Sequence, residues 1–152
     1  LYNTEGAKPQ IRYLEGIEGV RTMREVFEKL DGEFVEIYPL DSVIEDKHLL
    51  DGKDDHHRRL RDSDSKHRSI VTMREVDEKK LPKMGMGETR VLPSDKFPMR
   101  GNIVVRGDHT FIFSHKSAIL SVVIVSKEIA DVMRTMFELA WMGAQKYSED
   151  QL

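Results

Sequence analysis

Hydrophobic positions in the first part of the chain follow a strand, helix, strand pattern. A short apolar run over residues 11–14 predicts a strand. Apolar side chains then recur at helical spacing, which predicts a helix that ends near Asp31 and Gly32; they are Ile17, Val20, Met23, Phe27 and Leu30. Residues 33–40 return to a strand pattern that Pro39 closes. The N-terminal part is therefore expected to form a β-α-β unit.

The next segment is richer in charge, and its hydrophobic pattern is weaker. Residues 41–64 hold few apolar positions, and we interpret them as a helix interrupted at Asp51 and Gly52. Residues 69–76 predict a strand, and residues 79–87, which include Pro82, predict a loop. The middle of the chain therefore adds one broken helical segment and one strand.

The C-terminal half predicts more sheet and then one long helix. Short strand patterns cover residues 89–92, 102–106 and 109–114, and Gly107 with Asp108 between the last two is typical of a β-hairpin turn. Residues 118–125 are almost continuously branched and apolar, which predicts a central strand covered on both faces. Ser126 is then expected to cap an amphipathic helix that runs to about Tyr147. The predicted fold class is α/β, with a mixed β-sheet, packed helices and a long C-terminal helix.

Composition and charge fit one ordinary globular domain. The 152 residues are 39% hydrophobic and 34% charged, with a formal net charge of −3, which argues against nucleic acid covering the whole surface. The absence of cysteine excludes disulfides and thiolate metal clusters. No apolar run is long enough to span a membrane. We expect a cytoplasmic protein without membrane contact and without a cofactor.

One domain and two short ends are expected. Residues 1–9, polar and with Gly and Pro, look like the remnant of a linker; residues 10–148 form the single domain, and residues 149–152 form a tail. Because the chain begins at Leu1 rather than Met, we expect it to be part of a longer protein.

Metal chemistry has its main candidate in the charged segment 54–68. Carboxylates and imidazoles ligate zinc and other divalent ions, and a small metal-dependent hydrolase would use Asp54, Asp55, His56 and His57. The two adjacent histidines point to different faces of a helix, however, and no HExxH motif occurs. A solvated surface of mixed charge is therefore favoured over a metal site.

Four stretches of the chain bear a family resemblance: residues 9–28, 69–76, 89–114 and 122–145. Together they resemble the C-terminal regulatory domain of TrmB-type transcriptional regulators. The most specific part is the last, an apolar strand followed by SKEIA and a helix that contains FELAW. The resemblance covers nearly the whole chain and implies a core similar to the phospholipase D fold.

The resemblance also implies a function and partners. The chain would be the effector-sensing and dimerisation domain of a TrmB-like regulator, and a small molecule of unknown identity would shift it between two arrangements. It would form a homodimer and would contact DNA only through a winged helix-turn-helix domain that precedes this region in the family and that this chain lacks. The alternatives are the metal-dependent hydrolase above and a stand-alone adaptor protein of the same fold.

Catalysis of the phospholipase D type is not expected. Active enzymes of that family carry HxKxxxxD, in which the histidine is the nucleophile and the lysine binds phosphate. This sequence has no HxK, because the residues two positions after its six histidines are Leu50, Arg58, Arg59, Ser69, Phe111 and Ser117. We therefore expect the domain not to be an enzyme.

A ligand is expected at strand ends, because ligands of α/β folds favour that place. The strand end at Arg12 and Glu15, with Arg74 and Arg90 on neighbouring predicted strands, is the candidate ligand-binding site. The alternative is that these arginines pair with surface acids. Trp141 is expected to be a core or dimer contact rather than a residue that stacks on the ligand.

Overall fold

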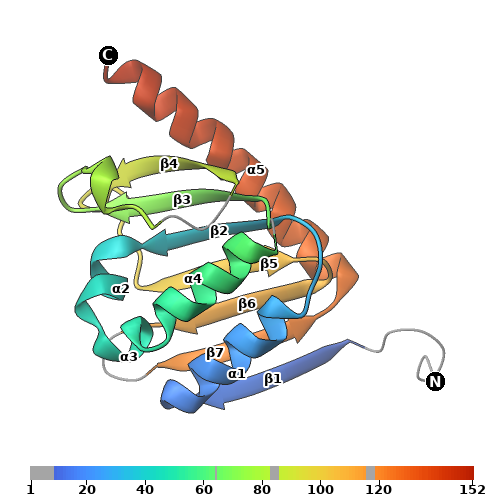
Figure 1. Ribbon diagram of the computed structural model, residues 1–152. Helices are drawn as coiled ribbons and strands as arrows, with labels where there is room; N and C mark the ends of the chain where they lie inside the picture. Colours follow the sequence, from blue (N-terminus) through green and yellow to red (C-terminus); the bar gives the residue numbers. More distant parts are fainter. Residues whose placement is uncertain (1–8, 64, 83–85, 116–118) are drawn as a thin grey trace.

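The structure, a computed structural model, describes residues 9–63, 65–82, 86–115 and 119–152. In chain order its elements are β1 (Gln10–Glu15), α1 (Gly16–Glu28), β2 (Phe34–Pro39), α2 (Leu40–Glu45), α3 (Lys47–Leu50), α4 (Lys53–Asp62), β3 (His67–Met73), the short 3-10 helix η1 (Glu78–Lys80), β4 (Gly87–Pro93), β5 (Gly101–Arg106), β6 (His109–Ser114), β7 (Leu120–Val125) and α5 (Lys127–Asp150). Figure 1 shows their arrangement.

The seven strands form one mixed sheet in the order β1-β7-β6-β5-β2-β3-β4. The pairs β2–β3 and β3–β4 are parallel, and the other neighbouring pairs are antiparallel. The predicted hairpin is confirmed as β5 and β6, and Gly107 at its turn has a φ of 60°, which glycine adopts without a steric cost. The predicted α/β class is therefore confirmed.

Helices cover the two faces of this sheet very unequally (Figure 1). We call the face covered by α1 to α4 the front face and the face covered by α5 the back face. Alternate residues of a strand point to opposite faces, so Phe34 packs with Phe27 of α1 while its neighbour Val35 packs with Phe137 of α5. The protein thus has two separate cores, one on each side of the sheet.

The prediction of a central strand over residues 118–125 is wrong in its position. The strand, β7, lies second from the edge, between β6 and the edge strand β1, and β5 is the middle strand. Val123 is buried on the front face, whereas Leu120 on the other side of the strand is 39% exposed because α5 packs on β2, β4, β5 and β6 instead. Residue 118 lies outside the described residues.

Helical structure between β2 and β3 is broken twice. The predicted interruption at Asp51 and Gly52 is confirmed, with Gly52 in the left-handed region at a φ of 72°. A second break at Asp46 separates α2 from α3. Strand β3 begins at His67 and ends at Met73, earlier than the predicted 69–76. These breaks place α2 and α3 at the end of the sheet where β2 stops and let α4 run back across the front face beside α1 (Figure 1).

The predicted long C-terminal helix is confirmed as α5. The Ser126 hydroxyl accepts a hydrogen bond from the Ile129 N–H at 3.3 Å and so caps the helix, as predicted. The helix continues to Asp150, which is beyond Tyr147 and beyond the predicted start of the tail. Within the described part of the chain, no helix is long and apolar enough to cross a membrane.

Candidate functional site

The four predicted ligand-binding residues do not form one site. Arg12 and Glu15 lie on β1, Arg90 lies on β4, and these two strands are the opposite edges of the sheet. Arg74 follows the end of β3, next to the β4 edge. The sequence placed these residues near strand ends but gave no strand order, so it could not separate them.

Their contacts fit structural roles. The Glu15 carboxylate accepts a hydrogen bond from the Tyr13 hydroxyl at 3.0 Å. Arg74 pairs with Glu45, so the surface pairing considered for it is observed. The Arg90 guanidinium lies 3.9 Å from the centre of the Trp141 ring and donates to the Trp141 carbonyl oxygen, which ties β4 to α5. Trp141 itself is buried in the back core, as predicted.

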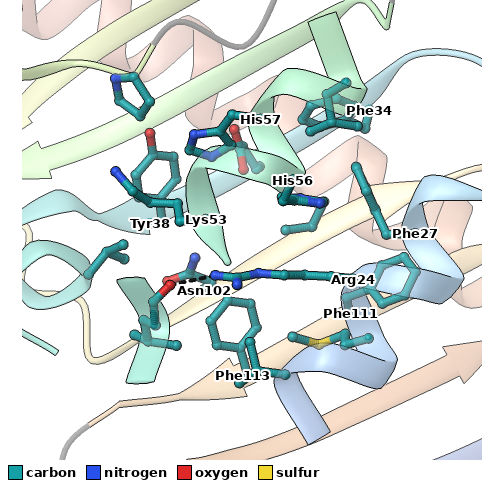
Figure 2. Close-up of a pocket in the computed structure, with 18 of the residues that line it drawn as sticks. Arg24, Phe27, Phe34, Tyr38, Lys53, His56, His57, Asn102, Phe111 and Phe113 are labelled. Atoms are coloured by element: carbon teal, nitrogen blue, oxygen red, sulfur yellow. Dashed lines mark hydrogen bonds between the residues drawn. The ribbon is translucent and has the colours of Figure 1, made fainter. Parts of the chain in front are cut away.

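A cavity of about 110 Å³ lies on the front face, between the sheet and the helices α1 to α4 (Figure 2). Side chains from the sheet, from helices α1 to α4 and from the loop after η1 line it: Val20, Met23, Arg24, Phe27, Phe34, Glu36, Tyr38, Leu40, Val43, Leu49, Lys53, His56, His57, Leu60, Pro82, Asn102, Val104, Phe111 and Phe113. We call this hollow the front cavity.

The walls of the front cavity are largely aromatic. The Phe27 ring lies 4.8 Å from the Phe34 ring and 5.6 Å from the Phe111 ring, in both cases edge to face. Phe27 comes from the predicted apolar stripe of α1, and Phe34 and Phe111 are inward-facing strand residues. The apolar pattern of the sequence therefore predicts that these residues face inward, although it does not predict the cavity beside them.

Arg24 brings a positive charge into this apolar enclosure. It lies on the same side of α1 as Val20 and Phe27, and Figure 2 shows its side chain stretched across the cavity, between His56 and Phe113. Its guanidinium donates to the backbone carbonyl oxygens of Leu49 and Asp51, both at 2.5 Å. Burial lowers the pKa of Arg24 from its usual value, because desolvation penalises the charged form.

Glu36 is a buried acid in the middle of β2. Ser69 on the neighbouring strand donates a hydrogen bond to its carboxyl group at 2.6 Å. Burial outweighs this bond and raises the pKa of Glu36 to about 7. Near neutral pH, the front cavity therefore contains a carboxyl group that is charged in only part of the molecules.

The charged residues Asp54, Asp55, Arg58 and Arg59 are exposed, as predicted for a solvated surface, but His56 and His57 line the front cavity, contrary to that prediction. The His56 side chain is only 13% exposed. Burial lowers the pKa of each histidine to about 3, and the positive charges of Arg24 and other cations add to the effect. Both rings are thus neutral at physiological pH. The prediction failed because α4 lies with this side against Phe27 and the sheet.

The metal hypothesis finds no support in the positions of these side chains. Among the described residues, no three histidine or acidic side chains are placed to hold a metal ion. Asp54 and Asp55 lie in the first turn of α4, where carboxylates are favourable beside the helix dipole.

Two buried polar atoms at the front cavity have no hydrogen-bond partner among the described residues. They are the Asn102 carbonyl oxygen Oδ1 and the His56 ring nitrogen Nδ1. Buried polar atoms are almost always bonded, because an unpaired one costs free energy. Together with the aromatic walls and Arg24, they make the front cavity the candidate ligand-binding site.

Sequence reasoning missed Arg24, Glu36 and Asn102, although two of them leave a signal. Glu36 shares a strand face with Phe34 and Tyr38, so a charged residue falls where the pattern expects an apolar one. Arg24 similarly lies four residues after Val20 and three before Phe27, inside the buried stripe of the helix. Polar residues at core positions were therefore the available sign of this site.

Comparisons of the sequence with known proteins identify no relative. No family model matches the chain, and no curated protein matches it.

Comparisons of the structure do find similar proteins. TrmBL2, an archaeal chromatin protein described with a novel mode of DNA binding, superposes with a TM-score of 0.58 over 93% of this chain at 16% identity. Nuc, a phospholipase D family member from Salmonella typhimurium, gives 0.59 over 88% of this chain at 12% identity, and NucT from Helicobacter pylori gives 0.53 over 86% at 7%.

The share of each similar protein that this chain covers differs. This chain spans 95% of Nuc and 94% of NucT but only 55% of TrmBL2. It therefore corresponds to a whole small phospholipase D-like protein and to about half of the larger one. At such low identities the likeness shows the fold alone: the chain has a phospholipase D-like fold, which it shares with part of TrmBL2.

Proposed function

We propose that this chain is the effector-sensing and dimerisation domain of a TrmB-like transcriptional regulator and has no catalytic activity of its own. The front cavity carries the proposal, because it is a partly open hollow lined by aliphatic and aromatic side chains and by unpaired buried polar atoms. Pockets of this kind are the usual binding sites of small molecules. The cavity is bounded by the sheet and by separate helices, so a ligand that fills it would favour one arrangement of those helices.

The fold comparison supports the regulatory half of the proposal. The chain matches about half of TrmBL2, whose described property is DNA binding. In our proposal DNA is contacted by a separate domain of the complete regulator, and the present domain changes the spacing or orientation of that domain when the effector binds.

The side chains at the front cavity support the absence of catalysis. The sequence lacks the HxK pair of active phospholipase D enzymes. His56 and His57 have a pKa of about 3 and are therefore weak bases, and a general base works best with a pKa near the working pH. Neither histidine is thus suited to accept a proton from a nucleophile at neutral pH.

An apolar stripe on α5 supports the self-association half of the proposal. The stripe consists of Val132, Met136, Leu139 and Met142, which are 57% to 67% exposed although α5 buries its other side. Exposed apolar patches commonly mark protein interfaces.

The charges of α5 favour a second copy as the partner of this stripe. An antiparallel pairing of two α5 helices, with a twofold axis near Leu139, places Asp131 close to the partner's Lys146, because residues whose numbers sum to about twice the axial position face each other. Asp131 and Lys146 are both exposed and charged in this arrangement. The proposed dimer therefore brings Asp131 and Lys146 of the two copies together on either side of the axis.

Two measurements on the purified chain test the proposal. Sedimentation velocity is expected to show a dimer, and Met136→Glu should shift it to a monomer. Val76→Glu, at another exposed apolar residue, is the matched control and should leave the dimer intact. Hydrolysis of bis(4-nitrophenyl) phosphate and of DNA, with and without added divalent metal, is expected to stay at the blank rate.

The opposite results overturn the proposal in separate parts. If the wild-type chain remains a monomer at high concentration, the dimerisation part of the proposal is wrong. Hydrolysis above the blank that is lost in a His56→Gln, His57→Gln double variant would assign an enzyme activity to the front cavity instead.

A further inference from the structure

From the geometry of the front cavity we infer that its ligand is a small monocarboxylic acid whose body is a compact branched or aromatic hydrocarbon. The inference rests on the proposed effector-sensing function and names the chemical class of the effector. Three features of the cavity carry it: its size and walls, the guanidinium of Arg24, which has more N–H donors than its two bonds use, and the cations Lys53 and Arg106 nearby.

Size and walls determine the body of the ligand. An apolar cavity of roughly 150 Å³ holds one benzene molecule, and the front cavity has about 110 Å³. Its deep wall consists of Phe27, Phe111 and Phe113, with Val20 and Leu49 beside them. This space is smaller than the cavity that holds benzene, so a short branched chain fits it and a single ring fits only with one edge at the open side of the hollow. A long chain or a fused ring system does not fit.

Arg24 determines the charge of the ligand's polar end. A guanidinium group has five N–H donors, yet its hydrogen bonds in the described structure go only to the carbonyl oxygens of Leu49 and Asp51. The Asp51 carboxylate pairs with Arg21, and the negative charges of Asp51 and Glu28 also act on Arg24. Arg24 still has more N–H donors than the two carbonyl oxygens use, so a carboxylate can accept from it.

The other charges around the cavity favour an anion as well. Lys53 lines the cavity, and Arg106 lies buried over the Phe27 ring, 4.8 Å from its centre. Among the described lining residues Glu36 is the only acid, and burial raises its pKa to about 7. Burial is the main cause of the lowered pKa of His56 and His57, and the positive charges of Arg24 and other cations add to it, although the Glu28 carboxylate lies 3.6 Å from His56 Nδ1. The neighbouring cations disfavour a positively charged ligand such as an amine.

Asn102 adds a hydrogen-bond acceptor to the cavity. Its buried Oδ1 has no partner within the described chain. An amide group donates through its nitrogen and accepts through its oxygen. The unpaired Oδ1 can only accept, so it fits a hydroxyl group on the acid and not the carboxylate itself.

Binding of matched probes to the full chain tests the inference. Isothermal titration uses isovalerate and benzoate as acids, isovaleramide and benzamide as neutral analogues of the same shape, and isopentylamine and benzylamine as cations. At least one acid is expected to bind at least tenfold tighter than its amide and its amine. Nuclear Overhauser contacts from the bound acid to the rings of Phe111 and Phe113 should place it in the front cavity.

Substitution of Arg24 separates recognition from folding. Arg24→Gln should weaken binding of the acid at least tenfold and leave the amide unchanged. Arg21→Gln is the matched control on the same helix and should bind the acid as the wild type does. If Arg24→Gln fails to fold, the comparison of acid, amide and amine on the wild-type chain decides the question alone.

Each contrary result has its own meaning. Tighter binding of an amine or an amide in the front cavity overturns the acid class and leaves the sensing function standing. Acid bound away from Phe111 and Phe113, or no binding of any probe, overturns the inference, and the dimer and hydrolysis measurements above then decide the proposed function separately.

Discussion

The two faces of the sheet contain hollows of different chemical character. The front cavity combines aromatic walls with Arg24, Glu36 and Asn102. On the back face, a groove of about 190 Å³ beside α5 is bordered by apolar side chains such as Ile103, Met133 and Met136. Apolar walls alone bind without fixing orientation, whereas a few placed polar groups give specificity. We therefore assign ligand recognition to the front face, although the back groove is larger.

The cores of the two faces differ as their hollows do: the back core is apolar, and the front core includes polar groups. The back core is a continuous cluster of Val35, Ile70, Val105, Phe137 and Trp141. The front core encloses a space and titratable groups with shifted pKa values. A cavity and buried polar groups both cost stability. The comparison indicates that packing on the back face stabilises the fold, whereas the cavity and buried polar groups on the front face lower its stability and are available for ligand binding.

Removal of the largest back-face side chain should have the largest effect. Trp141→Ala is expected to lower the free energy of unfolding by about 3 to 5 kcal/mol, because Trp141 stacks on Phe137 and carries Arg90 on its other side. Urea denaturation measures it, and Gln145→Ala, on the exposed side of α5, should cost less than about 0.5 kcal/mol. A loss for Trp141→Ala as small as that of the control would contradict the role assigned to the back face.

Removal of the buried acid on the front face should stabilise the protein. The folded pKa of Glu36 is about 7, above its ordinary 4.5, so the folded state holds the proton more tightly. This contribution is complete below about pH 4.5 and is lost as the pH rises through 7. The free energy of unfolding of Glu36→Gln, relative to that of the wild type, should therefore rise from pH 4.5 to pH 7 and stay constant above pH 7. The total rise should be about 3 kcal/mol.

Urea denaturation at pH 5 and pH 8.5 measures this gain. Glu25→Gln, at an exposed position of α1, is the control and should behave alike at both values. If Glu36→Gln does not gain relative to the wild type between these two pH values, the buried acid does not carry the cost assigned to it.

The two histidines of the front cavity should act with the opposite sign. Their folded pKa of about 3 lies below the ordinary 6.5, so they stay neutral in the folded state while the unfolded chain binds protons. Stability from this source is complete above pH 6.5 and falls with decreasing pH, by up to about 1.4 kcal/mol per pH unit for each histidine.

Glu36 opposes this slope below pH 7, so the Glu36→Gln variant is the better background for the measurement. In that background, stability should fall between pH 6.5 and pH 5, and adding His56→Gln and His57→Gln should flatten the profile. An equally steep profile in the triple variant would assign the acid sensitivity to other groups.

The cap of α5 should give the smallest of these effects. Ser126→Ala removes the hydrogen bond to the Ile129 N–H and should cost about 1 kcal/mol. Ser148→Ala, near the other end of α5, is the matched control and should cost less. Helices α2 and α4 of the front face begin without a side-chain cap. If the two serine variants lower the free energy of unfolding equally, the Ser126 cap does not stabilise α5 and does not distinguish the back face from the front face.

Local patterns in the sequence were sufficient for most elements. The apolar stripe of α1, the hairpin at Gly107 and the cap at Ser126 were all predicted and are all present. Each depends on residues close together in the chain, where backbone geometry and side-chain spacing set the outcome. Strand order depends on distant pairings, and β7 was therefore misplaced at the centre of the sheet.

The candidate site shows the same division more sharply. The sequence by itself determined the aromatic wall, because Phe27, Phe34 and Phe111 follow the periods of their helix and strands. Only the tertiary structure decided that Arg24 reaches carbonyl oxygens 25 and 27 residues away and that His56 turns inward against that wall. The four residues predicted to bind a ligand were separated by the same long-range pairing. The physical reason is that burial, charge and unpaired hydrogen bonds are properties of a place in space, and this place is assembled from segments that are distant in the chain.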